Sequence, residues 1–286
     1  MGASAAYVTF TDPEGVDDEK EVALAAWAEA GIIGHVVRWD TPGTDWAAFD
    51  AVVVRSPWDY VTRRAEFVGW AHHVESVTLL LNPAAVLERN TDKTYLRHLA
   101  APTVPTSWVA PGETLDLPFL DEYVVKPSVS AAARNTIRTG DRTVAVTHAA
   151  RLVAEGQTVM VQPYLDMVEA EGETSMLYFG GRFSHAVRRV PMLTGNVADL
   201  VEENGQAEPR TPEPDQIALA ERVLGEFPGV LYARVDLVRL ADGTPALIEL
   251  ELTEPYLYLR YAPGAAANLA DALAEAIARR AGGGGS

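Results

Sequence analysis

The sequence contains no cysteine, and this absence excludes several kinds of chemistry. Without thiols the chain has no disulfide, no thiolate nucleophile and no cysteine-ligated zinc or iron–sulfur site. It also lacks an apolar run approaching the ~20 residues that cross a bilayer. Its first residues do not place a basic stretch before an apolar one, as a secretory signal does. We therefore expect a cytoplasmic protein with no membrane association.

Basic side chains are scarce, with 23 Lys and Arg against 40 Asp and Glu and a formal charge of −17. Proteins that bind nucleic acid neutralise phosphates with clustered Lys and Arg, so we expect no nucleic-acid partner. A small phosphorylated ligand is still compatible, because a nucleotide needs only a few well-placed cations and a metal. The sequence has neither a P-loop pattern nor a Gly-x-Gly-x-x-Gly after a strand, which argues against both of those nucleotide sites.

The first ninety residues alternate strand and helix signals. Residues rich in β-branched and aromatic side chains (7–10, 32–39, 51–54 and 79–81) alternate with helical patterns at 17–30 and 63–74. This order predicts a parallel sheet built from βαβ units. Ligands of such sheets gather at the carboxyl ends of strands, so the segment 55–60 is expected at the mouth of this lobe.

A different pattern begins near residue 100. A short helix is expected at 91–99, and strands at 123–126, 143–146 and 158–161 predict a small, mostly antiparallel lobe over 100–165. Two hairpins follow, with turns at Gly180-Gly181 and Asp242-Gly243. Between them we expect an acidic, proline-bearing loop (200–215) and a helix (216–227), and after them a last helix (265–280). We predict an α/β protein with α+β lobes, divided into 1–90, 91–165 and 166–281, with 282–286 as a flexible linker.

The second hairpin carries the richest group of polar side chains. If Asp242-Gly243 forms a two-residue turn, Asp236 faces Glu249 and Arg234 faces Glu251, all on one face of the strands. Adjacent carboxylates repel one another, and a divalent cation removes that repulsion; Mg²⁺ takes one or two carboxylates plus substrate phosphates. We favour a metal site over a solvated strand pair in which Arg234 bridges to an acid. A register slip of one residue would break the alignment.

Lysine occurs only three times, at positions 20, 93 and 126. Lys126 ends an apolar strand and precedes a loop of small residues (128–133), an arrangement that suits phosphate binding by backbone N–H groups and one ammonium. A strand-end lysine that reaches solvent explains the position equally well. Lys93, taken alone, reads as a surface residue.

The first hairpin also pairs charges. Its Gly180-Gly181 turn predicts Glu173 opposite Arg188, either as an ordinary cross-strand ion pair or as part of a polar substrate pocket with the neighbouring Arg189.

Together these motifs resemble the ATP-grasp superfamily. They are the strand ending in Lys126, a hinge at 162–165, Glu-Gly-Glu at 171–173, and Arg234-x-Asp236 followed by Glu249-x-Glu251. Within the superfamily, segments 55–60, 183–187 and 249–251 are similar to the small actinobacterial ligases near O-ureido-D-serine cyclo-ligase. The chain departs from the family in lacking glycine at 130–133 and in carrying Glu251 where many members have Asn. The resemblance implies an ATP-grasp fold, with an N-terminal βαβ lobe preceding two lobes that hold ATP.

The resemblance also implies roles for individual residues. The ATP-binding residues would be Lys93, Lys126, Ser130, Gln162, Pro163, Tyr164, Leu165 and Glu169, running from the phosphates to the adenine and ribose. Asp236, Glu249 and Glu251 would hold two Mg²⁺, with Mn²⁺ as an alternative ion, and Arg234 would stabilise the transferring phosphoryl group. An amino-acid-like substrate would be held by Arg55, Ser56, Asp59, Tyr60, Glu173 and Arg188.

The expected function is that of an ATP-dependent carboxylate–amine ligase that acts through an acyl phosphate. Its leading form is ring closure of O-ureido-D-serine to D-cycloserine. The alternatives are an intermolecular, dipeptide-forming ligase and a non-catalytic nucleotide-binding module. An exposed edge of the first lobe leaves a homodimer open.

Overall fold

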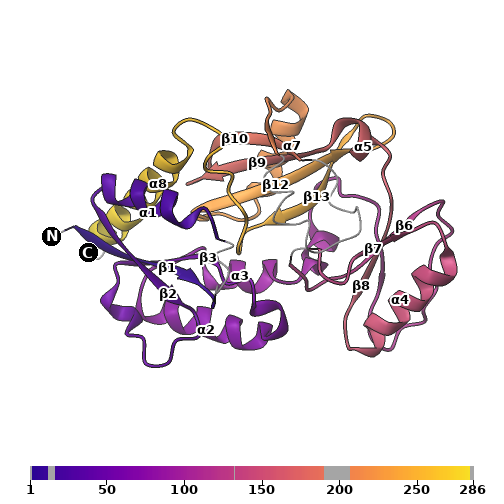
Figure 1. The fold of residues 1–286 in the computed structure, drawn as a ribbon, viewed down its shortest axis with the longest axis horizontal. Helices are drawn as coiled ribbons and strands as arrows, with labels where there is room; N and C mark the ends of the chain where they lie inside the picture. The colour runs from indigo at the N-terminus through magenta and orange to yellow at the C-terminus, as the bar shows by residue number, and fades with distance from the viewer. Residues whose placement is uncertain (1, 12–16, 132, 190–206, 284–286) are drawn as a thin grey trace.

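Three sheets organise the computed structural model, which describes residues 2–11, 17–131, 133–189 and 207–283 (Figure 1). Residues 200–206 of the expected acidic loop, residue 132 of the small-residue loop and the last three residues of the expected linker lie outside this part of the chain.

The N-terminal sheet is parallel, in the strand order β2-β1-β3-β4, and confirms the expected βαβ organisation. Apart from the edge strand β2, its strands are largely buried and apolar, as expected where helices cover a parallel sheet. The strands are β1 (Ala3–Thr9), β2 (Ile32–Arg38), β3 (Ala51–Ser56) and β4 (Leu80–Leu81). The helices are α1 (Lys20–Glu29), α2 (Arg64–Val77) and α3 (Ala84–Asn90), with 3₁₀ turns η1 (Trp46–Ala48), η2 (Tyr60–Thr62) and η3 (Lys93–His98).

The middle sheet is antiparallel, in the order β5-β8-β6-β7, as expected for this region. It comprises β5 (Ser107–Val109), β6 (Tyr123–Pro127), β7 (Ile137–Thr139) and β8 (Val159–Pro163), with helix α4 (Arg142–Ala154) against it. Its apolar residues form a separate core cluster, which includes Val125, Leu152 and Val161.

The strand predicted at 143–146 is wrong, because these residues form the start of α4. Asp141 caps the helix by accepting a hydrogen bond from the Thr143 backbone N–H at 2.7 Å. Ala145, Ala149 and Leu152 then form a buried stripe at helical spacing. This stripe and the cap override the β-propensity of the Thr and Val residues.

The large sheet is antiparallel, in the order β11-β10-β9-β12-β13. Its strands are β9 (Glu173–Phe179), β10 (Arg182–Arg189), β11 (Glu208–Pro209), β12 (Tyr232–Arg239) and β13 (Pro245–Glu251). The accompanying helices are α5 (Met167–Glu171), α7 (Pro214–Leu224) and α8 (Ala265–Gly283). Since α8 continues to Gly283, the first two glycines assigned to the linker are helical.

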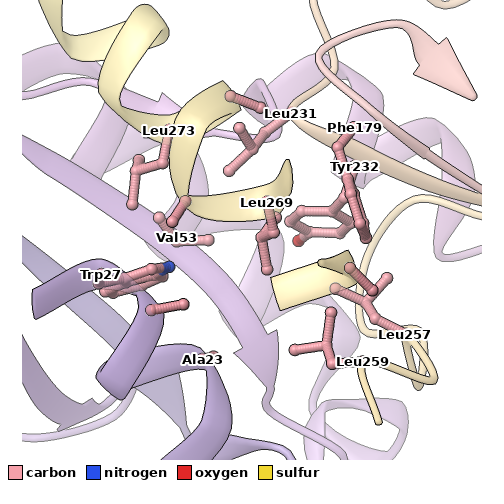
Figure 2. Close-up of a cluster of buried hydrophobic side chains, with 14 of the residues drawn as sticks. Ala23, Trp27, Val53, Phe179, Leu231, Tyr232, Leu257, Leu259, Leu269 and Leu273 are labelled. Atoms are coloured by element: carbon pink, nitrogen blue, oxygen red, sulfur yellow. The ribbon is translucent and has the colours of Figure 1, made fainter. Parts of the chain in front are cut away.

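A shared core joins the N-terminal sheet to the large sheet. Helix α1 packs against α8, and Figure 2 shows Trp27 and Val53 of the N-terminal lobe beside Leu231, Leu269 and Leu273. All five residues are buried in one apolar cluster. This core sets the carboxyl end of β3 against the chain that follows β13.

The outer edge of β13 is covered by side chains of the segment that leaves the N-terminal sheet. The Asn90 amide donates to the Leu250 carbonyl at 2.7 Å and accepts from the Leu252 N–H at 2.8 Å. The Tyr95 hydroxyl both donates to the Leu250 carbonyl and accepts from the Leu250 N–H, each at 2.8 Å. An edge strand would otherwise expose unpaired backbone groups. We call Asn90, Tyr95 and these contacts the covered edge of β13.

Candidate active site

The hairpin of β12 and β13 has the predicted register at its polar positions. Asp236 pairs with Glu249 and Arg234 pairs with Glu251. The turn is longer than predicted, because Arg239 pairs with Pro245 and leaves a five-residue connection (240–244). A bulge at Ile248 then restores the register. The alternate side chains Val235, Leu237, Leu250 and Leu252 are in the core, as predicted.

We call the opposite side of these two strands, with Arg234, Asp236, Glu249 and Glu251, the carboxylate face. Asp236 is 1% exposed, and its oxygens accept from Ser175 Oγ at 2.7 Å and from Arg189 at 3.0 Å. Arg234 Nε donates to Asp236 at 3.0 Å, and the same guanidinium also pairs with Glu251. Burial alone would raise the pKa of Asp236, but the two arginines outweigh it and hold that pKa below its ordinary value.

Glu249 and Glu251 carry the negative charge nearest to the lysines. Lys93 Nζ lies 3.1 Å from Glu249 and donates to the Ser130 carbonyl at 2.7 Å. Burial, reinforced by the charge of Glu249 and opposed by Arg234, raises the pKa of Glu251 to about 7. These carboxylates are therefore crowded, and Lys93 and Arg234 are their partners among the described residues.

The fit of this face to a divalent cation can be judged from its donors. Carboxylate oxygens two residues apart on one strand are hard ligands of the kind that Mg²⁺ prefers, and a cation would relieve the crowding that raises the pKa of Glu251. In the arrangement seen, no three His, Asp or Glu side chains of the described residues are grouped closely enough to hold a metal ion. A metal would therefore have to displace Lys93 or Arg234 from its carboxylate.

Two lysines from different elements approach the carboxylate face. Lys93 lies on η3 and Lys126 on β6, and they are only 8% and 9% exposed, so neither is the surface or solvent-reaching side chain considered above. The Lys93 N–H donates to the Ser128 carbonyl at 2.8 Å, which fixes the small-residue loop beside it. The side-chain ammonium of Lys126 forms no hydrogen bond or ion pair with any described residue. Its burial lowers its pKa, and the charge of Glu249 opposes that shift.

The residues expected at the adenine lie where β8 ends. The Gln162 side chain is buried and donates to Thr106 Oγ1 at 2.8 Å. The Tyr164 hydroxyl donates to Glu169 at 3.1 Å, and the Arg138 guanidinium stacks 3.3 Å from the centre of the Tyr164 ring. Pro163 ends the strand, and Leu165 packs beside Val104 and Val168. The structure thus brings Tyr164 and Glu169 together, whereas the Gln162 amide is already engaged.

Two of the expected substrate residues instead connect parts of the fold. Arg55 Nη2 donates to the Pro255 carbonyl at 2.9 Å and lies 3.5 Å from Glu19. Ser56 Oγ donates to Asp17 at 2.6 Å. Glu19 in turn accepts from the Leu257 and Leu259 N–H groups, and burial, opposed by Arg55, raises its pKa to about 7.

Asp59 and Tyr60 point to different surroundings. Asp59 accepts from Trp39 Nε1 at 2.9 Å and from Arg63 at 2.5 Å, within the N-terminal lobe. Tyr60 is 3% exposed, and its hydroxyl is hydrogen-bonded to the carboxylate of Glu254. Tyr60, like Arg55 and Trp58 of the expected segment 55–60, therefore touches the chain that follows the carboxylate face.

The predicted pairing of Glu173 with Arg188 is wrong by one residue. The Gly180-Gly181 turn forms as expected, but a bulge at Ser184 shifts the strands so that Arg189 faces Glu173. Arg189 donates to Glu173 at 2.6 Å, whereas Arg188 Nε donates to the Glu171 carbonyl at 2.7 Å. Glu173 thus joins the network around Asp236 through Arg189.

Sequence reasoning missed three side chains of this region: Ser175, Glu19 and Glu254. Glu254 had a signal, since it follows Glu251 by three residues in a Glu-x-Glu-x-x-Glu-Pro segment. Ser175 and Glu19 had none, because their roles depend on packing between distant segments.

A family model and a curated relative both identify the same protein, DcsG, as similar to this chain. A family model described as the N-terminal domain of D-cycloserine synthetase DcsG matches residues 5–82. The cycloserine biosynthesis protein DcsG of Streptomyces lavendulae is 35% identical over 285 residues, covering 92% of this chain and 95% of that protein.

Solved structures with a similar fold include DcsG itself. The crystal structure of D-cycloserine synthetase DcsG superposes with a TM-score of 0.84 at 32% identity, over 96% of this chain and 100% of that one. A D-alanine–D-alanine ligase from Bacillus anthracis complexed with ATP has a TM-score of 0.68 at 15% identity, over 99% and 100% of the two chains, a likeness of fold alone. Across the described residues, no helix has the length and apolar character needed to span a membrane.

Proposed function

The chain is an ATP-grasp ligase and belongs to the family of D-cycloserine synthetase DcsG, and from this we propose that it closes the ring of O-ureido-D-serine to form D-cycloserine. The observation that carries the proposal is the arrangement of charge at the carboxylate face. Lys93 and Lys126 come from separate elements and approach the face that bears Arg234 and the carboxylates. Such a mixture of buried cations and carboxylates suits a nucleotide triphosphate bound with a divalent cation.

In the proposed reaction, ATP converts the substrate carboxylate into an acyl phosphate, whose phosphate can leave. A carboxylate cannot expel its own oxygen, so a carboxylate oxygen first attacks the γ-phosphorus of ATP and ADP leaves. The nitrogen bonded to the side-chain oxygen then attacks the acyl carbon, and phosphate leaves. Because the ring nitrogen of D-cycloserine carries only hydrogen, water must then attack the carbamoyl carbon. The bond from that carbon to the ring nitrogen breaks, the nitrogen takes a proton, and the released carbamate breaks down to ammonia and carbon dioxide. Both reacting groups belong to one molecule, so a high effective concentration favours ring closure.

The chain's own cations would stabilise the charge that moves in the first step. Lys126, a buried ammonium with no partner among the described residues, would bind a phosphate oxygen directly. Lys93 would exchange Glu249 for phosphate while the Ser130 carbonyl holds its ammonium in place. Arg234, oriented by Asp236, would stabilise the transferring phosphoryl group.

Asp236, Glu249 and Glu251 would hold Mg²⁺ or Mn²⁺, which when bound neutralises charge on the phosphates of ATP. At the other end of the nucleotide, residues 162–165 would bind adenine, and Glu169, beside Tyr164, would accept from the ribose hydroxyls.

The test is ADP release with Mg²⁺ and ATP, with and without O-ureido-D-serine, followed by mass analysis of the products. D-Serine, which lacks the ureido group, is the matched control substrate. Substrate-dependent ADP together with D-cycloserine is the expected result. ADP release only with pairs of other amino acids, with a product that retains both, would replace ring closure with intermolecular ligation. Nucleotide binding without ADP release over a broad amino-acid panel would refute the assignment of a substrate.

A further inference from the structure

Glu254 differs from the other carboxylates near the carboxylate face in having no positive partner. Asp236 has Arg189, Glu249 has Lys93 and Glu251 has Arg234. Glu254 forms no ion pair with any residue that the structure describes, and its carboxylate is hydrogen-bonded to the hydroxyl of Tyr60. Removing a carboxylate from water without a countercharge costs free energy. One bound cation would balance the charge of Glu254.

The backbone around Glu254 is fixed between the N-terminal lobe and the large sheet. Trp58 Nε1 donates to the Glu254 carbonyl at 3.2 Å, and Arg55 donates to the next carbonyl, of Pro255, at 2.9 Å. Tyr60, the hydrogen-bond partner of the side chain, is 3% exposed. Glu254 is therefore held where the carboxyl end of β3 meets the chain that leaves β13, the edge at which ligands of parallel sheets gather.

Glu254 is also close enough to the carboxylate face to feel its charges. The charges of Glu251, Lys93 and Glu249 all act on the Glu254 carboxyl. A small molecule that touches Glu254 can thus reach the region where phosphoryl transfer is proposed.

We propose that Glu254 binds the α-ammonium group of the amino-acid substrate, an inference that rests on the proposed ligase function. An ammonium supplies the missing positive charge and donates a charge-assisted hydrogen bond. In an α-amino acid the ammonium and the carboxyl group share one carbon atom. Holding the ammonium at Glu254 therefore sets the carboxyl group toward Lys93 and the carboxylate face, where it would receive phosphate. Tyr60 acts as a positioning residue, because its hydroxyl engages the carboxylate of Glu254 and fixes its direction.

The main test compares Glu254→Gln with the wild type. Gln keeps the volume and the ability to accept from Tyr60 but loses the charge. We expect the KM for the amino acid to rise roughly 10–100-fold, whereas the KM for ATP and the Mg²⁺ concentration for half-maximal activity stay unchanged. Glu29→Gln, on the exposed end of α1, is the matched control and should change none of these constants. Thermal unfolding confirms that both variants fold.

A substrate analogue gives a second readout that a merely structural role would not move. The analogue carries hydrogen in place of the α-amino group. The wild type should strongly prefer the amino substrate over it, and Glu254→Gln should lose most of that preference. Tyr60→Phe should weaken the preference only several-fold, since it loosens Glu254 without removing its charge.

The outcomes separate the inference from the function on which it rests. If the wild type turns over the substrate while Glu254→Gln keeps its KM and its preference, the assignment of Glu254 is wrong and the ligase function stands. A raised Mg²⁺ requirement would instead identify Glu254 as a metal ligand and overturn the inference. If the wild type uses other amino acids, the comparison is made with them. If none supports ADP release, the proposed function itself fails.

Discussion

Strand β13 makes polar contacts on two sides, and the two sides differ in how their groups are satisfied. On the covered edge, Asn90 and Tyr95 are neutral and complete the hydrogen bonds of the backbone. On the carboxylate face, side chains of opposite charge oppose one another. Beside that face, Lys126 and Glu254 form no ion pair with any described residue. We infer that the neutral, completed contacts stabilise the strand and that the incomplete charge balance indicates a ligand site. The predictions below test that distinction.

Glu249→Gln should have the largest effect. Removing this charge takes away a proposed metal ligand and changes the partner of Lys93, so we expect ATP turnover to fall by roughly 10²–10⁴. The protein should remain folded, because the backbone of β13 is held from its covered edge. Steady-state ADP release and thermal unfolding measure the two quantities. Turnover equal to that of the wild type would refute the metal assignment.

Lys126→Met should weaken ATP binding without weakening the fold. We expect the KM for ATP to rise roughly 10–100-fold, because a charge-assisted contact to phosphate is lost. The free energy of unfolding should stay the same or increase, since a buried cation with no ion pair is replaced by an apolar side chain of similar length. Lys20→Met on α1 is the control and should leave the KM unchanged. A large loss of stability in Lys126→Met would show that the lysine is structural.

Asn90→Ala should produce the opposite result. It leaves the Leu252 N–H without its partner and removes one of the two donors to the Leu250 carbonyl, so we expect a loss of about 1–3 kcal/mol in the free energy of unfolding. Activity per folded molecule should change little. The control is Asn268→Ala, whose exposed amide donates to Ser184, and it should cost under about 0.5 kcal/mol. Urea unfolding measures both, and equal losses would remove the distinction between covered and exposed amides.

Glu19 is a buried charged group whose contacts are structural, unlike those of the carboxylate face. Burial raises its pKa from 4.5 to about 7, so between these values the folded state keeps a proton that the unfolded state has lost. The free energy of unfolding should therefore fall as pH rises through this window, by up to about 1.4 kcal/mol per pH unit, and flatten above it. Glu19→Gln should make that slope shallower, by up to the roughly 1.4 kcal/mol per pH unit that one proton contributes. An identical slope in the variant would assign the titration to other groups.

The two hairpins show how far a sequence determines register. At Gly180-Gly181 the predicted turn forms, yet a bulge at Ser184 changes the partner of Glu173. At Asp242-Gly243 the predicted turn is too short, yet a bulge at Ile248 brings Asp236 opposite Glu249 as expected. Turn residues constrain only the local geometry, and bulges depend on packing across the whole sheet. The alternation of apolar and charged residues was the more reliable guide to the carboxylate face.

The order of chemical motifs along the chain was sufficient to predict the ATP-grasp family. It was not sufficient for residues whose roles arise between segments. Arg55 and Ser56 stand in a motif at the end of β3, but the structure engages them with Glu19, Asp17 and the chain after β13. Such contacts join residues that the local pattern does not relate.

The shared core of Figure 2 has a consequence for how the molecule can move. Because Trp27, Val53 and Leu273 are parts of one apolar cluster, the N-terminal and large sheets cannot separate without exposing it to water. Most apolar residues of the middle sheet form a core of their own, whereas Met160 of β8 packs in the cluster under the large sheet. Moving the middle sheet would therefore expose less apolar surface than separating the other two sheets.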